Sequence, residues 1–403
     1  MAASRAVVIG SGIGGLTAAA ALFRSGWQVT VLERAASLEP IGAGISLAPN
    51  SQRALDVIGL GDEVRSLAAW QGDGGIRTPS GRRLARTDSS AAAERFGGPL
   101  VLLHRSALIG LLRARLPASA VHPGTPARIV APGSADGRRA VVRTPSGDIE
   151  ADLVIGADGI GSAVRTALFP RHPGPSYSGF TTWRVIAPGL GRTFSPHETW
   201  GRGELWGSHP LKDGGIYAYA AAAVPAGVRA ADDEKAELLR RYGDWHDPIP
   251  GIIDSVAPDQ VLRHDVYHLD VPLPSFHRGR TALVGDSAHA MVPFLGQGGN
   301  QAIEDAVVLA HHVTQGGDLG AGLASYSAAR VPRTTAVVRK AAQVSRMTRL
   351  SGAPAVALRD GLMSAVSRLG PGLVLRTFDG ICDWRPPQRT YAAVTREGQS
   401  TRP

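Results

Sequence analysis

Three glycines near the start of the chain limit what it can fold into more than any other feature. Gly10, Gly12 and Gly15 form the pattern G-x-G-x-x-G directly after a short apolar run. An alanine-rich segment and a second apolar run follow, and Glu33 comes at the end of that run. This order predicts a βαβ unit that binds a dinucleotide, with a strand over 5–10, a helix over 14–25 and a strand over 28–32.

Each part of the pattern has a physical task. We expect Gly10 to permit the tight turn, Gly12 to let the backbone approach a pyrophosphate, and Gly15 to let helix and strand pack closely. The N-terminus of the helix offers free N–H groups and partial positive charge to the phosphates. Glu33 is expected to accept hydrogen bonds from ribose hydroxyls. The pattern alone does not separate NAD from FAD.

The composition is that of an ordinary globular protein. The chain has 403 residues, 43% of them hydrophobic, which fits two modest domains or one elaborated domain. It contains no run of about 18 apolar residues, so we expect no membrane span. The first residues enter a strand directly, without the features of a secretory signal. A single cysteine, Cys382, excludes an internal disulfide and favours a reducing, cytoplasmic location.

The formal net charge of +9 comes almost entirely from arginine. The arginines are spread along the sequence and form no dense basic run with interleaved aromatic residues. A nucleic-acid-binding groove would need such a run, so we expect no nucleic-acid partner. A basic surface still favours the approach of an anionic cofactor or substrate.

The remaining segments predict an α/β chain with an inserted sheet. Asn50 or Ser51 is expected to cap a helix that ends near residue 60, and 103–116 is expected to form an amphipathic helix. Short runs rich in Thr, Trp and Tyr predict an antiparallel sheet over 174–275, interrupted by a charged helix. A basic helix over 322–349 precedes an end that proline and glycine break. The predicted parts are a Rossmann-like nucleotide-binding domain (1–72, 99–173 and 276–330), a mainly antiparallel substrate domain (73–98 and 174–275) and a C-terminal helical tail (331–403).

Two later segments follow apolar strands and carry aspartates among glycines. They are "GADGIGSAVR" at 156–165 and "GDSAHAMVPFLGQGGNQAIEDA" at 285–306. Taken singly, each also fits an ordinary turn or a helix cap. With the glycine pattern, "GAGI" at 42–45 and the pair His104–Arg105, the order resembles the FAD-dependent aromatic hydroxylases. These are the single-component flavoprotein monooxygenases with the p-hydroxybenzoate hydroxylase fold, and the salicylate and urate hydroxylase branches are the most similar.

The resemblance implies roles for charged side chains around FAD. Glu33, with Arg34 beside it, would hold the adenosine ribose. Arg105 would reach the pyrophosphate or the ribityl region, the alternative being a solvated arginine on a helix. Asp286 would accept hydrogen bonds from the ribityl chain. Asp158 lies in a motif that serves both FAD and NAD(P)H in the family, the alternative being that it fixes its own loop.

The segment before the last predicted helix has a chemical rationale of its own. Gly296, Gly298 and Gly299 would let the backbone lie against the flavin ring, with Gln297 and Asn300 as polar contacts. Reduced flavin is anionic, and a helix N-terminus aimed at it would stabilise that charge. The full set of expected cofactor contacts is Gly10, Gly12, Ile13, Gly14, Gly15, Glu33, Arg34, Gly44, Ser46, Arg105, Asp158, Asp286, Gly296, Gly298, Gly299 and Asn300.

The chemistry that the resemblance implies is carried by the cofactor. NADPH or NADH would reduce FAD after binding transiently, because no second glycine module exists for it. The reduced flavin would take up O2 as a C4a-hydroperoxide and transfer one oxygen to an electron-rich carbon, while the protein orients the substrate and excludes water. No metal is needed, and His289 has no partners at metal-ligand spacing.

The substrate is expected between the inserted sheet and the flavin. As in related hydroxylases, a base or hydrogen-bond acceptor would help to deprotonate a ring hydroxyl; Tyr217 is the first candidate and His209 the second. Arg184 would hold a carboxylate or phenolate, or else brace the domain interface. Packing alone is the alternative for Tyr217 and Tyr219. Candidate wall residues are Trp183, Trp200, Leu205, Trp206, Tyr217, Tyr219, Pro293 and Phe294.

The apolar residues Leu205 and Phe294 argue against a small, very polar substrate such as urate. We expect an aromatic or polyketide-like small molecule. Epoxidation, Baeyer–Villiger oxidation and antibiotic inactivation on the same fold remain open alternatives, as does a reductase or regulator that binds FAD or NAD without oxygenating. The identity of the nicotinamide and the oligomeric state also stay open.

Overall fold

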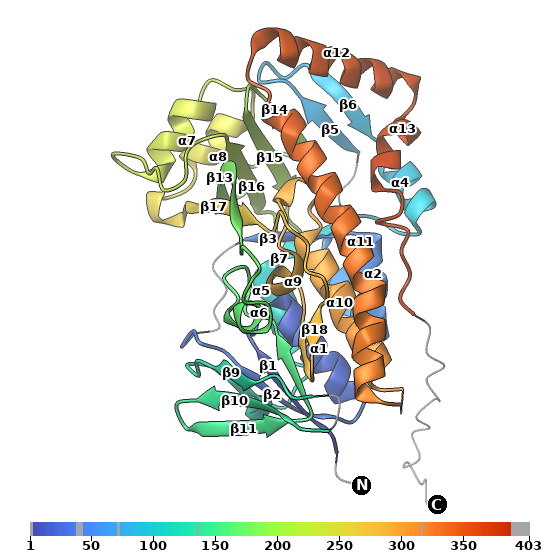
Figure 1. Cartoon of the computed structure of the whole chain (residues 1–403). Coiled ribbons are helices and arrows are strands. Elements are labelled where there is room, and N and C mark those ends of the chain that lie inside the picture. Colours follow the sequence, from blue (N-terminus) through green and yellow to red (C-terminus); the bar gives the residue numbers. More distant parts are fainter. Residues whose placement is uncertain (1–2, 38–42, 71–72, 135–136, 316, 388–403) are drawn as a thin grey trace, which may run out of the picture.

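Figure 1 shows the computed structural model of the chain, in which residues 3–37, 43–70, 73–134, 137–315 and 317–387 are described. Two large sheets lie one above the other, and long C-terminal helices run along them. Four sheets are present among the described residues, with six, seven, three and three strands. No helix among these residues is both long enough and apolar enough to cross a membrane.

The six-stranded sheet holds the glycine pattern. Its centre is parallel, with β1 paired to β2 and β12, and β12 paired to β19. These strands are apolar along most of their length because helices and neighbouring strands bury them. The order is β18 (His277–Arg278), β19 (Thr281–Leu283), β12 (Leu153–Gly156), β1 (Arg5–Ile9), β2 (Gln28–Leu32) and β8 (Val121–His122).

Helix α1 (Ile13–Arg24) begins where β1 ends and packs against the later helix α10 (Gly298–Val313). Alanines fill the middle of α1 and are buried, so the two helices approach closely. The short helices α6 (Ala163–Leu168) and α9 (Asp286–His289) follow β12 and β19. Parallel strands end at one edge of the sheet, so the loops after β1, β12 and β19 meet there.

Two small sheets flank this unit. One contains β3 (Gly44–Leu47), β7 (Val101–His104) and β4 (Ala69–Trp70), and the other β9 (Arg128–Ala131), β10 (Ala140–Thr144) and β11 (Gly147–Ala151).

The prediction of a helix over 103–116 is wrong at its start. Residues 101–104 pair with β3 in an antiparallel register, and α5 spans only Arg105–Arg113. The 3-10 turn η1 (Ala118–Ala120) follows it.

The prediction that Asn50 or Ser51 caps helix α2 (Pro49–Val57) is wrong. Its N-cap residue is Ala48, and Pro49 occupies the first turn, where a missing N–H costs nothing. Asn50 and Ser51 are therefore inside the helix, and both side chains are buried. They bind α10 instead, through Glu304 and Asn300. Helix α3 (Gly61–Leu67) continues the chain.

The seven-stranded sheet is antiparallel except where β14 runs parallel to β5. Residues 73–98, which the sequence assigned to the substrate domain, add the antiparallel strands β5 and β6 at one end of the sheet and helix α4 (Ser89–Phe96). The order is β17 (Leu262–His268), β13 (Ser176–Ala187), β16 (Ile216–Ala222), β15 (Glu204–Pro210), β14 (His197–Trp200), β5 (Gly74–Arg77) and β6 (Arg83–Thr87).

Helices cover one face of the seven-stranded sheet. Trp183 and Trp206 are buried there against Tyr242 of α7 (Glu234–Tyr242) and residues of α8 (Ile249–Asp254). The 3-10 turn η2 (Pro258–Gln260) leads into β17. The opposite face of the sheet is not covered by α7 and α8, and it faces the segment before α10 and the C-terminal helices.

The C-terminal part is more helical than its proline and glycine content indicated. Helix α11 (Leu319–Thr348) is followed by α12 (Ala353–Leu369), α13 (Pro371–Leu375) and the 3-10 turn η4 (Arg376–Phe378). Pro354 is tolerated because it lies in the first turn of α12. The expected broken end is therefore wrong over 353–369, where α12 crosses the top of the molecule above β5 and β6 (Figure 1).

Candidate active site

A cavity of about 1300 Å³ lies between the two large sheets. One wall is made by the loops after β1 and β19 and the start of α10. The opposite wall is made by the free face of the seven-stranded sheet, and α12, α13 and η4 close the far end. The loop wall includes Gly12, Ile13, Gly14, Gly15, Gly44, Ser46, Arg105, Asp286, Gly296, Gly298 and Gly299, all of which were expected to contact a cofactor.

The three glycines of the first loop have different structural roles. Gly10 has φ +108°, and a Cβ there would lie 2.3 Å from the carbonyl oxygen of Ala157. A Cβ on Gly15 would lie 2.1 Å from the carbonyl oxygen of Gly10. A Cβ on Gly12 would meet nothing within 4 Å, because Gly12 faces the cavity. Gly10 and Gly15 therefore fix the turn, and Gly12 leaves room for a ligand.

Glu33 lies at the end of β2 beside this loop. Its carboxylate accepts hydrogen bonds of 2.9 Å from the N–H and hydroxyl groups of Ser11 and from the N–H group of Ala35. Burial acts in the opposite direction, but these hydrogen bonds keep the pKa of Glu33 below its usual value. Glu33 and the exposed Arg34 do not line the cavity itself. Their expected contact with an adenosine ribose stays a prediction.

Asp158 and Arg165 hold their own loop. Asp158 accepts hydrogen bonds from the Ser162 hydroxyl (2.5 Å), the Ser287 hydroxyl (3.1 Å) and the N–H group of Val164 (3.1 Å). Arg165 is buried and donates to the carbonyl oxygens of Ile160 and Ser287. These bonds tie the loop after β12 to α9. Asp158 does not line the cavity, which agrees with the loop-fixing alternative.

Asn300 also acts as a brace. Its amide nitrogen donates to the carbonyl oxygens of Ser46 (3.0 Å) and Gly296 (2.6 Å), and its oxygen accepts from the N–H group of Ala48 (2.8 Å). The side chain is buried and joins α10 to the β3–α2 connection. It therefore sets the positions of backbone that lines the cavity without lining it.

A buried ionic cluster lies beneath the start of α10. Arg330 of α11 donates to Asp305 (2.6 Å) and Glu304 (2.5 Å), and all three side chains are almost inaccessible to solvent. Asp305 in turn accepts from the N–H group of Gly285 (2.8 Å) and pairs with His289 (2.5 Å). The cluster thus anchors the residue directly before Asp286, and His289 serves it rather than a metal. The described residues hold no group of three or more His, Cys, Asp or Glu side chains suited to a metal ion.

Arg105 and Asp286 are the charged groups of the loop wall. Both side chains are open to the cavity. The enclosing protein and the nearby Arg184 lower the pKa of Arg105, while Asp286 acts in the opposite direction. The wall therefore presents one charged donor, Arg105, and one charged acceptor, Asp286. His104, which precedes Arg105, does not line the cavity and pairs with Asp213 at 2.8 Å.

Tyr217 and Tyr219 project from one strand into the cavity. Residues two apart share a face of a strand, and both rings line the cavity with centroids 5.7 Å apart. The ring of Tyr217 lies against Gly44, where a Cβ would be 2.5 Å away. Burial raises the pKa of Tyr217, and the charges of Arg184 and Arg105 act in the opposite direction. Tyr217 therefore stands between the two walls.

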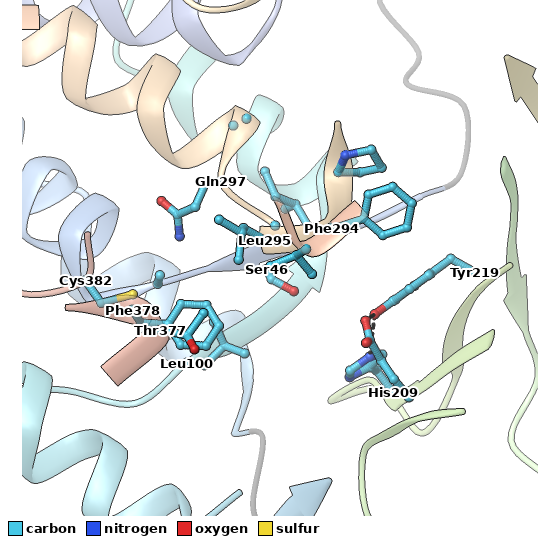
Figure 2. A pocket seen from close by; sticks show the side chains of 18 of the residues that line it. Ser46, Leu100, His209, Tyr219, Phe294, Leu295, Gln297, Thr377, Phe378 and Cys382 are labelled. Atoms are coloured by element: carbon cyan, nitrogen blue, oxygen red, sulfur yellow. Dashed lines mark hydrogen bonds between the residues drawn. The ribbon is translucent and has the colours of Figure 1, made fainter. Parts of the chain in front are cut away.

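A carboxylate that the sequence did not single out completes the sheet wall. The Tyr219 hydroxyl donates to Glu198 Oε1 over 2.5 Å, and Glu198 Oε2 accepts from the indole N–H of Trp200 over 2.8 Å. His209 stacks on Tyr219, with its Nε2 atom 3.4 Å from the hydroxyl (Figure 2). Burial and the neighbouring His197 lower the pKa of His209 to about 4. Near neutral pH, the imidazole of His209 is therefore uncharged.

Large apolar side chains make up much of the remaining lining. Leu205 and Trp200 lie in the sheet wall, and Phe294 packs edge-on against Phe180 with centroids 4.8 Å apart. In Figure 2 Phe294, Leu295 and Ser46 lie across from the Tyr219–His209 pair. Trp183 and Trp206, offered as wall residues, instead lie on the helix-covered face of the sheet; their indole N–H groups bind Glu234 and Ser208. Strand alternation reverses their direction relative to Leu205. Pro293 and Arg184 line the cavity as expected.

The model of the FAD binding domain family matches residues 3–202 and 255–341. The chain belongs to this family. It is 36% identical over 366 residues to aurachin C monooxygenase/isomerase of Stigmatella aurantiaca (90% of this chain, 94% of that protein), and 33% identical over 380 residues to 3-amino-4-hydroxybenzoate 2-monooxygenase of Streptomyces cremeus (90% and 92%).

A solved structure agrees with the fold. HpxO of Klebsiella pneumoniae, complexed with FAD and uric acid, superposes with a TM-score of 0.84 at 28% identity, over 94% of this chain and 96% of that one. The fold class, FAD as the cofactor and the class of enzyme, a FAD-dependent monooxygenase, are confirmed. The roles of the single residues remain predictions.

The residues of the loop wall fit the cofactor. Added Cβ atoms on Gly12 and Gly296 would meet nothing within 4 Å, and one on Gly298 would meet only Asp286, at 3.9 Å. These positions form a backbone cradle that a planar or phosphate group can approach. Arg105 and Asp286 supply one donor and one acceptor beside it, as phosphate oxygens and ribityl hydroxyls require.

Proposed function

We propose that this enzyme uses NADH or NADPH and O2 to hydroxylate a weakly polar aromatic small molecule. One observation carries the proposal: the Glu198–Tyr219 pair faces the glycine cradle across a single cavity whose other walls are largely apolar. Oxygen transfer to an aromatic carbon needs such an acceptor for the proton of a ring hydroxyl. We also propose a cytoplasmic location, on the ground of the single cysteine.

The loop wall would hold FAD. Backbone N–H groups at the start of α1 would bind the pyrophosphate, Arg105 would add charge there, and Asp286 would accept from the ribityl chain. The start of α10 would lie against the flavin ring, where its N-terminal dipole favours negative charge. When bound, the flavin supplies reducing power from the nicotinamide and delivers one atom of O2. The braces through Asn300 and Asp305 keep this wall rigid.

The sheet wall would orient and activate the substrate. A ring hydroxyl placed near Tyr219 could pass its proton through the tyrosine hydroxyl to Glu198 Oε1, because that hydrogen bond already exists. Tyr217 would bind the substrate from the side of Arg184, whose positive charge favours a developing phenolate. The neutral His209 would hold the Tyr219 ring in place by stacking. A substrate bound between the two sheets would displace water from the reacting carbon.

The apolar lining bears on the class of substrate. Leu205, Phe294 and Trp200 supply no charge for a small polar ring. HpxO, whose structure contains uric acid, has the same fold, so a difference in substrate must come from side chains in the cavity. We therefore favour a larger aromatic or polyketide-like molecule over urate. Epoxidation and Baeyer–Villiger oxidation of such a molecule are the alternative reactions.

A panel of phenols, quinolones and aromatic polyketides tests this proposal. The FAD-loaded protein is expected to oxidise NADH or NADPH faster with the correct compound and to give a product heavier by one oxygen. The position of that oxygen, found by NMR, separates ring hydroxylation from epoxidation and Baeyer–Villiger insertion. Tyr217→Phe should slow product formation while flavin reduction stays largely intact. A protein that takes up FAD but oxygenates no member of a broad panel would contradict the proposal.

A further inference from the structure

The far end of the cavity carries a stripe of large apolar side chains that the protein leaves uncovered. Leu358, Leu362 and Val366 lie one turn apart on α12 and are 64%, 58% and 40% exposed. Met347 of α11 and Leu100 face the same space and are also exposed. Water-exposed leucines on one helix face are unfavourable unless something covers them, because each carries about 2 kcal/mol of transfer free energy.

This stripe belongs to the same cavity as the glycine cradle and the two tyrosines. In Figure 1, α12 crosses the end of the molecule beyond β5 and β6, away from β1 and β2. The stripe is therefore remote from the residues expected to hold FAD. Figure 2 shows Phe378, Thr377 and Leu100 on the side of the cavity opposite His209 and Tyr219. The apolar space thus extends beyond the position of an aromatic ring between the two sheets.

Among the described residues, two charged side chains line the cavity near its far end, and both have partners within the protein. Asp88 follows β6, and its carboxylate accepts from the N–H group of Ala91 (2.9 Å) as the cap of α4. The guanidinium of Arg359 donates to Asp360 (3.0 Å) and to the carbonyl oxygen of Gly201 (3.1 Å) and lies over the Trp200 ring. Burial raises the pKa of the Cys382 thiol to about 12, so that group is neutral. The stripe itself is apolar, so it favours a hydrocarbon over a ligand segment that ends in a carboxylate or phosphate.

We propose that the substrate of this monooxygenase carries a hydrocarbon chain of several carbons, and that Leu358, Leu362 and Val366 of α12 bind this chain while the aromatic ring lies against Tyr217 and Tyr219. The inference rests on the proposed function, since it concerns the same cavity. It adds a chain-binding subsite, and it makes α12 a determinant of specificity. The chain would also shield the cavity from solvent at its far end.

Binding of 4-n-alkylphenols from methyl to hexyl to the FAD-loaded protein tests the proposal by isothermal titration calorimetry. The dissociation constant is expected to fall about two- to fourfold for each added CH2 group. In Leu362→Gln and Leu358→Gln this dependence should become clearly shallower. Both positions are more than half exposed, so the variants are expected to fold, which thermal melting checks.

Leu369→Gln is the matched control. Leu369 lies on the same helix and is 79% exposed, but it does not line the cavity. The Leu369→Gln substitution should leave the dependence of the dissociation constant on chain length unchanged. Equal effects of all three substitutions would mean adsorption to the surface of α12 and would overturn the inference, as would dissociation constants that do not depend on chain length. Because calorimetry measures binding without turnover, the chain-binding proposal can be tested even if the enzyme oxygenates none of these phenols.

Discussion

Tyr219 reaches Glu198 across an intervening strand because the residue between them is Gly207. Tyr219 of β16 pairs with Gly207 of β15, which pairs with Glu198 of β14. A Cβ on Gly207 would lie 2.3 Å from the tyrosine ring, so only glycine lets the ring lie flat over β15. The 2.5 Å hydrogen bond to Glu198 Oε1 follows from this arrangement.

Replacing that carboxylate tests its proposed role as proton acceptor. Glu198→Gln keeps the size and the Trp200 contact but removes the charge, so we expect product formation to slow by at least tenfold. FAD binding and the rate of flavin reduction should not change. Rapid-mixing absorbance with a responsive substrate measures both half-reactions. Glu204→Gln, on β15 and paired with Arg241 away from the cavity, is the control. Equal rates in wild type and Glu198→Gln would leave Glu198 a structural residue.

Asp286 supplies the acceptor beside the glycine cradle. Asp286→Ala would remove the proposed hydrogen bonds to the ribityl chain, and it would leave Arg105 without its nearby negative charge. We expect FAD to bind at least tenfold more weakly, as measured by flavin fluorescence on titration of the apoprotein. Asp213→Ala, which removes a surface partner of His104, should leave FAD affinity intact. Unchanged affinity in Asp286→Ala would refute the assigned contact.

The glycines of the first loop should separate folding from binding. Gly12→Ala places its methyl group in open space, so the apoprotein should keep its stability while FAD binds at least tenfold more weakly. Gly15→Ala forces a methyl group against the carbonyl oxygen of Gly10 and should lower the free energy of unfolding by about 1–3 kcal/mol. Urea denaturation of both apoproteins and FAD titration make the comparison. The reverse pattern would mean that Gly12 is the structural residue.

The loop wall and most residues of the sheet wall could be predicted from the sequence, but the carboxylate of Glu198 could not. Gly10, Gly12 and Gly15 act within one turn, so their spacing alone carries the information. Glu198 lies beside Tyr219 because both residues pair with Gly207, one from each neighbouring strand. The spacing of residues in the sequence does not reveal how strands pair. The prediction for Trp206 failed for another reason: Trp206 follows Leu205 directly, and successive side chains of a strand point to opposite faces, so the two residues cannot both face the cavity.

Helix α12 escaped prediction for a different reason. Pro354 and Gly361 indicate a broken segment, yet the proline lies in the first turn and the glycine faces open space. Neither residue therefore opposes the helix strongly at its actual position. The helix is kept in place by packing against β6, a contact between parts of the chain far apart in sequence. Its apolar stripe could be interpreted only once the cavity was seen.

The ion cluster beneath α10 should be essential for folding. Arg330→Met leaves Glu304 and Asp305 buried without their main partner, and breaking a buried pair in this way costs about 3–5 kcal/mol. Chemical denaturation of the apoprotein measures this loss. Arg143→Met, which breaks an exposed pair with Asp148, should change stability little. A stable Arg330→Met protein with normal FAD affinity would show that the cluster does not anchor the Gly285–Asp286 turn.

The stability of the fold should fall in mild acid because of His209. Burial, with the neighbouring His197, lowers the pKa of His209 to about 4, whereas an unfolded histidine titrates near 6.5. Between these values the unfolded chain binds a proton that the folded chain does not, so the free energy of unfolding decreases as pH falls from 6.5 towards 4.

For His209 alone, the expected loss of unfolding free energy is about 2 kcal/mol between pH 7 and pH 5. Urea denaturation at both pH values should show the loss in wild type, and a smaller one in His209→Gln. His122→Gln, on the exposed edge strand β8, should retain the full loss. An identical pH dependence in His209→Gln and wild type would mean that folding does not lower the pKa of His209.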